Sequence, residues 1–247
     1  MSRQDLPLNG FTVQALLLLA ISIHCNNGFE LARSLLDKTT SIALEIGMQF
    51  KYFAITHSNG DYVLEESWRR TWWGLYVVDG IFQAIQRSNY FALWVVQADV
   101  DLPCEESQYS SENIPEPHSM FQYNEREFSE NEASYSSFTY LIDIVRILGS
   151  VMAVAGEGGN LSDSLVDDAD GCLVNWELHL QENKKDVLRS DGEIDEPLFH
   201  AHMLFNVTKV FLHRQRSRLA HSPAENLTKC APTLPSSEVL LPQRKSY

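Results

Sequence analysis

One stretch of the chain, residues 65–80, constrains its fold more than any other. After a charged first turn this stretch is apolar on every side, and it contains two adjacent tryptophans, Trp72 and Trp73. Adjacent side chains on a helix point about 100° apart, so the two indole rings need neighbours on two different faces. A helix that is apolar all round is buried. The stretch therefore predicts a helix over residues 64–86 that lies in the middle of a helical domain.

The charged turn that opens the stretch supports the same helix. Glu65 precedes Arg69 by four residues, and Glu66 precedes Arg70 by the same spacing. With the glutamate on the N-terminal side, each such pair stabilises a helix by about 0.2–0.5 kcal/mol. Both pairs therefore favour a helical conformation before the apolar run begins.

Hydrophobic periodicity predicts further helices on both sides of this one. Their expected ranges are 12–25, 29–48, 138–154, 163–181 and 197–213. An Asn-Asn-Gly turn joins the first two into a helical hairpin, and the first is apolar on nearly all faces, so we expect it to be buried. No pair of strands with hairpin turn residues occurs. The predicted fold class is all-α, with stacked antiparallel helix pairs around a central apolar helix.

The segments between the helices differ in composition. Residues 50–62 are polar and contain Asn59-Gly60, which predicts a loop, whereas residues 90–100 are rich in aromatic and β-branched types that favour an extended segment. Residues 105–137 are acidic and serine-rich, and we interpret them as a solvated surface loop or as an acidic interaction segment. Residues 184–193 predict a charged turn.

These differences divide the chain into four predicted parts. Residues 1–104 and 138–221 form the N-terminal and C-terminal portions of one helical domain. Residues 105–137 form the acidic loop between them, and residues 222–247 form a proline-containing tail.

Several motifs follow one another in order along the first half of the chain. They are Glu65-Glu66, Arg69-Arg70, Trp72-Trp73, Asp79 and the segment Asp99-Val100-Asp101-Leu102-Pro103. This order resembles the fungal-specific transcription factor domain, the middle homology region of zinc-cluster (Zn2Cys6) regulators. The chain departs from the family pattern at two places. Gly80 stands where arginine is usual, and Arg87-Ser88-Asn89 replaces a Gly-Arg-Pro-like turn.

The resemblance implies a regulatory domain that modulates transcription by RNA polymerase II in the nucleus, with metabolic or secondary-metabolite gene clusters as candidate targets. The partners it implies are a homodimer or a heterodimer with an intact regulator, the transcription machinery and a small apolar metabolite. DNA would be bound only through a zinc-cluster head. The alternative is a helical protein-interaction module, or a small-molecule sensor, that has no such head. We expect neither an enzyme nor a membrane partner.

Charge and cysteine spacing limit what this chain binds. Its 247 residues carry a formal net charge of −14, and affinity for nucleic acid comes largely from lysine and arginine that neutralise phosphates. The four cysteines are Cys25, Cys104, Cys172 and Cys230, and none belongs to the Cys-x2-Cys pairs that wrap a zinc cluster. We therefore expect no cofactor in this chain, and zinc only in a DNA-binding head that the chain lacks.

Three aspartates are candidates for a role beyond solubility. Asp79 lies inside the apolar helix, where a lone charge is costly, so we expect it to pair with a basic residue or a helix N-terminus. Asp99 and Asp101 have the spacing of paired carboxylates for acid–base chemistry. We favour the alternative that they cap or bridge helix ends, for example with Arg69 or Arg70.

Four aromatic residues are candidates for the lining of a ligand pocket: Trp68, Trp72, Tyr76 and Trp94. Ordinary core packing accounts for them equally well. An apolar cavity between the central helix and residues 99–103 would favour a sensor. A filled core with an exposed apolar face would favour a protein-interaction module.

Overall fold

The computed structural model describes residues 7–86, 88, 90–126, 133–156, 163–189 and 192–214. In these ranges the chain forms α-helices, two short 3-10 helices and no β-strand, apart from one isolated bridge between Leu188 and Ile194. The helices are α1 (Gly10–Cys25), α2 (Phe29–Glu45), α3 (Lys51–His57), α4 (Tyr62–Ile85), η1 (Ala92–Val95), α5 (Glu106–Ser110), α6 (Met120–Asn124), α7 (Ser137–Gly156), α8 (Asp163–Leu178), η3 (Glu182–Lys184) and α9 (Glu196–Arg214). The predicted all-α fold class is confirmed.

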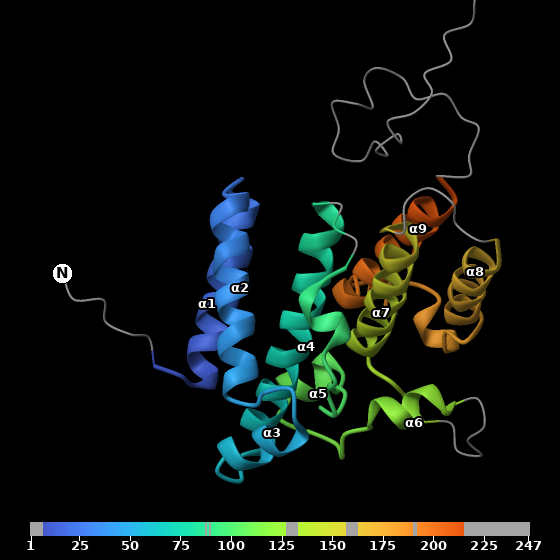
Figure 1. Ribbon diagram of the computed structural model, residues 1–247. Coiled ribbons are helices and arrows are strands. Elements are labelled where there is room, and N and C mark those ends of the chain that lie inside the picture. Colours follow the sequence, from blue (N-terminus) through green and yellow to red (C-terminus); the bar gives the residue numbers. More distant parts are fainter. Residues whose placement is uncertain are drawn as a thin grey trace, which may run out of the picture.

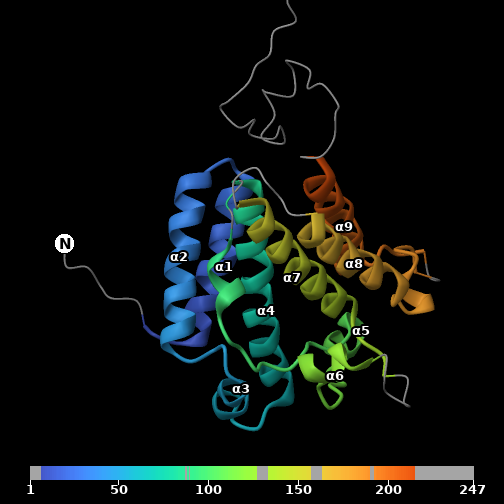
Figure 2. The same cartoon turned by 45° about the vertical axis from the view of Figure 1, so that its right-hand side comes forward.

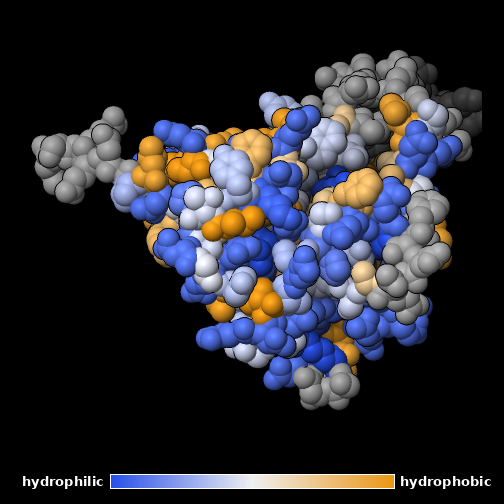
Figure 3. Space-filling view, turned by 90° about the horizontal axis from the view of Figure 1, so that it is seen from below, coloured by the Kyte–Doolittle hydropathy of each residue, from blue (hydrophilic) through white to orange (hydrophobic). Residues whose placement is uncertain are grey.

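Helix α4 lies between two groups of helices (Figure 1). On one side α1 and α2 form a hairpin and both contact α4, and on the other side α7 packs against α4, α8 and α9. Figure 2 shows the same order after a turn of the molecule. The short helices α3, α5 and α6 lie at one end of the molecule. Seen from that end, the surface is mostly hydrophilic, with hydrophobic side chains in small separate patches (Figure 3).

The local sequence explains where α4 begins and why it is buried. The side chain of Asp61 accepts hydrogen bonds from the backbone N–H groups of Val63 and Leu64 at 2.9 and 3.2 Å, as an N-cap residue does. Further along, Trp72 is 1% exposed and Leu75 is fully buried. The prediction of a buried helix over the apolar run is confirmed.

The glycine that departs from the family pattern lies where α4 and α7 approach each other. A Cβ atom on Gly80 would lie 2.7 Å from Cγ1 of Val145 and 3.4 Å from the ring of Phe91. On α7, a Cβ atom on Gly149 would lie 2.4 Å from the indole of Trp94. These positions leave no room for a side chain, so a glycine at position 80 permits the close contact of the two helices.

Helix α1 is less buried than its composition predicts. Phe11 is 61% exposed and Leu18 is 68% exposed, although Val13 and Ala20 on the other face are fully buried. The reason is position: α1 lies at the edge of the bundle, where α2 and α4 cover only part of its surface. The expectation that this helix is buried is therefore wrong for its outer face.

Three of the segments expected to be irregular contain ordered structure. Residues 50–62 include α3, whose Phe53 is buried, so the predicted loop is wrong there. In residues 105–137 the described part contains α5 and α6, and Tyr123 is 0% exposed. This part therefore contains two short helices, while its other described residues up to 126 are exposed or half-buried, as expected of a surface segment. Lys184, in the expected charged turn, is also buried.

Two of the predictions concern residues that lie outside the described ranges. Arg87 and Asn89 of the substituted turn, and the tail over residues 222–247, lie outside the described residues. The boundaries of the four predicted parts stay a prediction.

Candidate functional site

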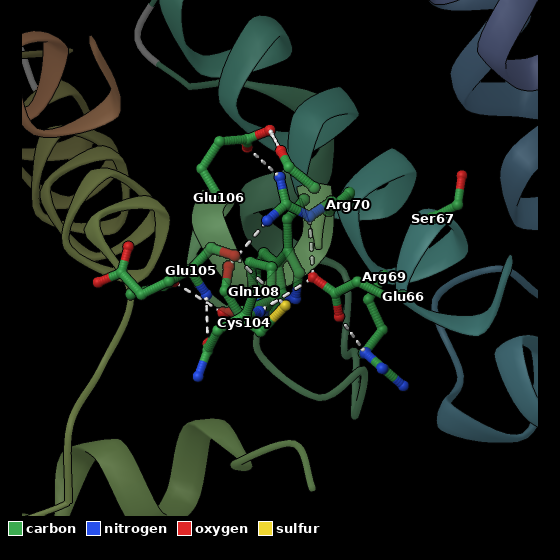
Figure 4. Close-up of polar contacts among 12 residues, drawn as sticks. Glu66, Ser67, Arg69, Arg70, Cys104, Glu105, Glu106 and Gln108 are labelled. Atoms are coloured by element: carbon green, nitrogen blue, oxygen red, sulfur yellow. Dashed lines mark hydrogen bonds and ion pairs between the residues drawn. The ribbon is translucent and has the colours of Figure 1, made fainter. Parts of the chain in front are cut away.

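The two glutamates and two arginines of the family motif on α4, Glu65, Glu66, Arg69 and Arg70, form a largely buried ionic cluster (Figure 4). Glu66 is 0% exposed and binds both arginines of the motif: its carboxylate accepts from Nε of Arg69 at 2.8 Å and from Nε of Arg70 at 2.9 Å. Glu65 accepts from Nη1 of Arg69 at 2.9 Å. The i,i+4 pairs predicted from the sequence are thus present, and they lie against the protein interior rather than on an outer helix surface.

The same cluster binds the backbone of the chain that follows η1. The carboxylate of Glu66 accepts from the N–H of Cys104 at 2.9 Å, while Nη2 of Arg70 donates to the carbonyl of Cys104 at 2.9 Å. Arg70 also binds Glu106 at 2.6 Å. Burial, and next the charge of Glu66, raise the pKa of the Cys104 thiol to about 11. These contacts fasten the segment around Cys104 to the first half of α4.

The Asp-x-Asp-x-Pro segment is held by a different set of contacts. The indole N–H of Trp73 donates to the carbonyl of Asp101 at 3.0 Å. Asp99 accepts from the backbone N–H of Lys51 at 2.7 Å, at the start of α3, and Asp101 pairs with Nζ of Lys51 at 2.8 Å. The two aspartates therefore cap and bridge a helix end, as favoured from the sequence, but their basic partner is Lys51 rather than the arginine pair of α4.

Further ion pairs and hydrogen bonds link Glu105, which follows Cys104, to the C-terminal helices. Lys184 binds Glu105 and donates to Oγ of Ser137 at 2.6 Å. Ser137 donates in turn to Asp195 at 2.7 Å, and Asp195 accepts from the N–H of Leu198 at 3.2 Å near the start of α9. Through Cys104 and Glu105, the contacts of Glu66 thus connect α4 to α7 and α9. We call this set of contacts the Glu66 cluster, and it forms a structural joint between these helices.

Asp79 has the partners that its position demands. One carboxylate oxygen pairs with Nη1 of Arg33 on α2 at 2.9 Å, and the other accepts from the N–H of Leu93 in η1 at 3.0 Å. The prediction of a basic or helix N-terminal partner is confirmed on both counts.

A cavity of about 490 Å³ lies beside α4, where α6, α7, α8 and η1 meet. Its walls include three aromatic side chains, from Tyr76, Trp94 and Trp176. Asn124 and Cys172 also line it and are exposed, so the cavity opens to solvent. Its volume is in the range of roughly 300–1,000 Å³ that small-molecule sites occupy.

The charged part of the cavity lining is a carboxyl group among arginines. Asp143 accepts from the hydroxyl of Tyr123 at 2.9 Å and pairs with Nη1 of Arg146 at 3.2 Å. Burial raises the pKa of Asp143, although Arg146, Tyr123 and Arg126 act in the opposite direction. The Nε atom of Arg126 is shielded from solvent and has no hydrogen-bond partner among the described residues. The polar groups of this site are therefore incompletely matched.

The four aromatic candidates are divided between this cavity and the core. Tyr76 and Trp94 line the cavity. Trp68 packs against Phe11 and Phe53 instead, with ring centroids 4.9 and 6.0 Å apart, and Trp72 lies in the core. A ligand-binding role for any of the four stays a prediction.

Sequence reasoning missed the polar lining of the cavity. Asp143 and Arg146 interrupt an otherwise apolar run in α7, and a charged pair three residues apart inside such a run is the signal that would have found them. Arg126 follows α6 in the expected loop and carried no comparable signal.

Among the described residues, no group of three or more histidine, cysteine, aspartate or glutamate side chains is placed to hold a metal ion. In the same part of the chain, no helix is long and apolar enough to cross a membrane.

The described part of the chain is all-α, with a buried ionic cluster on α4 and a partly polar cavity beside it. The chain belongs to the fungal specific transcription factor domain family, whose model matches residues 11–196. The family is one of transcription factors and not of enzymes.

A curated relative of the chain is also a transcription factor. The chain is 40% identical over 232 residues to the C6 finger domain transcription factor iacK of Pestalotiopsis fici. The alignment covers 94% of this chain and 34% of iacK, so the chain spans about a third of that protein. No solved structure matches the chain.

Proposed function

We propose that this chain is the regulatory domain of a zinc-cluster transcription regulator that acts in the nucleus on RNA polymerase II transcription. The observation that carries the proposal is the family match over residues 11–196, which includes the helices from α1 to η3 and the motif cluster. Metabolic or secondary-metabolite gene clusters are the proposed targets. DNA is contacted through a zinc-cluster head, because the net charge of −14 does not suit binding to phosphates by this chain.

The proposed architecture is one of helix pairs stacked around α4. In it, the α1–α2 hairpin and the α7–α9 group are the two sides of one unit, and the Glu66 cluster is the joint between α4 and the α7–α9 group. A change at the cavity beside α7 is then passed to α4 through packed helices, which is how a regulatory domain converts binding into a change of state.

The test is a tethered reporter assay. The chain is fused to a heterologous DNA-binding domain, and transcription is measured from a reporter that carries the sites of that domain. We expect transcription to differ from that of the DNA-binding domain alone, and the difference to disappear in the Glu66→Ala variant, whose joint is broken. A fusion that is indistinguishable from the DNA-binding domain alone would remove the support for this function.

A second candidate function is a protein-interaction module that has no DNA-binding head. The observation in its favour is the outer face of α1, where Phe11, Leu18 and Leu19 are exposed. The partner in this proposal is a second copy or an intact regulator. Immunoblotting of the endogenous protein separates the two functions. A size well above 28.1 kDa, with two Cys-x2-Cys pairs in the additional sequence, supports the DNA-binding regulator, whereas a size of 28.1 kDa supports the module.

A further inference from the structure

The charge of the cavity differs in sign from that of the protein as a whole. Two guanidinium groups, from Arg126 and Arg146, and one carboxyl group, from Asp143, are the charged groups among the lining residues. The cavity therefore has a positive formal charge in a chain whose net charge is −14. A positive concave site attracts anions, because low-dielectric walls concentrate the field.

Arg146 is the better placed of the two arginines to bind an anion. Within the described residues the hydrogen bonds of its guanidinium are made by Nη1: with Sδ of Met120 at 3.1 Å, with Oδ1 of Asn124 at 3.2 Å and with Oδ1 of Asp143 at 3.2 Å. A guanidinium presents five N–H donors and binds carboxylates best through two parallel bonds of about 2.7–2.9 Å. An arriving carboxylate can therefore make shorter bonds with Arg146 than its present partners do.

The aromatic walls indicate what the rest of the ligand is. Trp176 offers little surface to a ligand, because it is only 1% exposed, its indole N–H donates to the carbonyl of Tyr140 at 3.2 Å and its ring stacks on Phe205 at 5.1 Å. Trp94 is held against α7, where Gly149 leaves room for its ring. The half-buried indole of Trp94 is therefore the aromatic surface that the cavity offers, and it favours a planar, conjugated partner that lies against it.

We propose that this cavity binds a planar aromatic carboxylate, with the carboxylate at Arg146 and the ring against the indole of Trp94. This ligand differs from the small apolar metabolite that the family resemblance suggests, because the site offers charge and hydrogen bonds as well as aromatic surface. Its role as an effector rests on the proposed function, whereas binding itself does not. Asp143 is then the internal competitor that occupies Arg146 when the ligand is absent.

The first experiment is calorimetric titration of the full chain with matched probes. They are 2-naphthoate, its neutral amide 2-naphthamide, and cyclohexanecarboxylate, which has the charge without the aromatic ring. We expect 2-naphthoate to bind at least about 10-fold more tightly than either of the others, because a charge-assisted hydrogen bond and an aromatic contact each contribute on this scale.

Two variants locate the carboxylate. Arg146→Gln is expected to weaken 2-naphthoate binding about 10-fold or more and to leave 2-naphthamide binding nearly unchanged. Lys185→Gln is the matched control, since it removes the same unit of charge from an exposed residue outside the cavity. Equal weakening by both variants, equal binding of acid and amide, equal binding of the non-aromatic acid, or no binding of 2-naphthoate at about 10 mM would each overturn the proposal.

A second measurement needs no substitution and is independent of any folding defect. Cys172 lines the cavity and is exposed, while Cys25 is exposed on α1, on the other side of α4. We expect 2-naphthoate to slow the labelling of Cys172 by a maleimide and to leave the rate at Cys25 unchanged. Equal protection of both thiols, or of neither, would contradict binding in this cavity. If Cys172 is protected but the reporter fusion does not respond to 2-naphthoate, the binding site stands and its role as an effector site falls.

Discussion

The regions around Glu66 and Asp143 contain the same kinds of groups and differ in how closely these groups meet. Each has a carboxyl group beside two arginines, with aromatic rings around it. Around Glu66, three donors lie 2.8–2.9 Å from the carboxylate. Around Asp143, one donor lies at 2.9 Å, the nearest arginine lies at 3.2 Å, and a cavity of about 490 Å³ adjoins the group.

The difference separates a structural role from a binding role. A buried ion pair stabilises a fold only when its geometry is good and its remaining lone pairs are satisfied. Glu66 meets that condition and fastens the segment around Cys104 to α4. Asp143 does not, so its surroundings retain the capacity to bind something else. The family motif therefore marks the part of the domain that holds its shape, and the cavity lies outside the motif.

The largest effect is expected from the Glu66→Ala substitution. It leaves Arg69 and Arg70 buried without their shared carboxylate, and breaking such a pair costs about 3–5 kcal/mol. Urea unfolding monitored by tryptophan fluorescence measures the loss. The control is Glu182→Ala, because Glu182 forms an exposed pair with Lys185 and exposed pairs contribute about 0–1 kcal/mol. Equal losses in the two variants would mean that the Glu66 cluster is not a structural joint.

A thiol reagent compares the two regions directly. Cys104 lies in the Glu66 cluster and its pKa is raised from 9.0 to about 11, whereas Cys172 lies exposed in the cavity wall. The raised pKa lowers the thiolate fraction of Cys104 at about pH 8 by about 100-fold. A thiolate of higher pKa is more nucleophilic, and this recovers about 10-fold of the lost reaction rate. We expect Cys104 to react at least about 10-fold more slowly than Cys172, as measured by mass spectrometry of labelled peptides.

The same measurement has an internal check. Burial is the main cause of the raised pKa of Cys104, and the charge of Glu66 is the next. Glu66→Ala should therefore speed the labelling of Cys104 and leave Cys172 unaffected. Labelling of Cys104 as fast as that of Cys172 in the unsubstituted protein would show that the cluster is open.

The long helices could be predicted from the sequence because each carries its own periodic pattern. Helix α4 was expected over residues 64–86 and is found at Tyr62–Ile85, and α7 was expected over 138–154 and is found at Ser137–Gly156. Helix α3 was missed because it has only seven residues, Lys51–His57, which is too few to show a helical period. Its stability comes from the contacts of Phe53 and Lys51 with other segments, which the local sequence does not contain.

The site was harder to predict than the fold, for a physical reason. The partners of Asp79 could be predicted in kind, since a buried charge demands an opposite charge or a helix end. The identity of Arg33 could not, because it lies 46 positions away. The cavity depends on residues from five separate elements, so no single stretch of sequence carries its pattern. Tyr76 and Trp94 were found as aromatic residues, while the charges beside them were not.

A smaller effect is expected where α4 meets α7, between the two regions. Gly80→Ala places a Cβ atom 2.7 Å from Val145. Overpacking of this kind costs about 1–3 kcal/mol, and the better helix propensity of alanine offsets about 0.8–1 kcal/mol. The net expected loss of unfolding free energy is about 0–2 kcal/mol. Gly171→Ala in α8 is the matched control, because a Cβ atom there meets nothing within 4 Å.

The control should give a gain of about 0.8–1 kcal/mol. The double variant Gly80→Ala with Val145→Ala tests the stated cause, since removal of the Cγ atoms relieves the contact. If the loss at Gly80 were the same with and without the Val145 substitution, close approach of the two helices would not be its origin.

The smallest effect is expected at Asp143, where the sign matters more than the size. Burial raises the pKa of this carboxyl group above its ordinary value of 3.8, despite Arg146, Tyr123 and Arg126. The folded state therefore favours the protonated form, and the contribution of this group to stability is present at low pH and lost as the pH rises through the folded-state pKa. Asp143→Asn removes that loss, so the variant should gain stability relative to the unsubstituted protein as the pH rises above about 4.

The measurement is urea unfolding of both proteins across this pH range, with Asp170→Asn as the control because Asp170 is an exposed acid on α8 paired with His213. A difference between the Asp143 variant and the unsubstituted protein that stays flat with pH, or falls as the pH rises, would show that the carboxylate is well matched. The site around Asp143 would then resemble the joint around Glu66. An incoming carboxylate would in that case compete less well with Asp143 for Arg146.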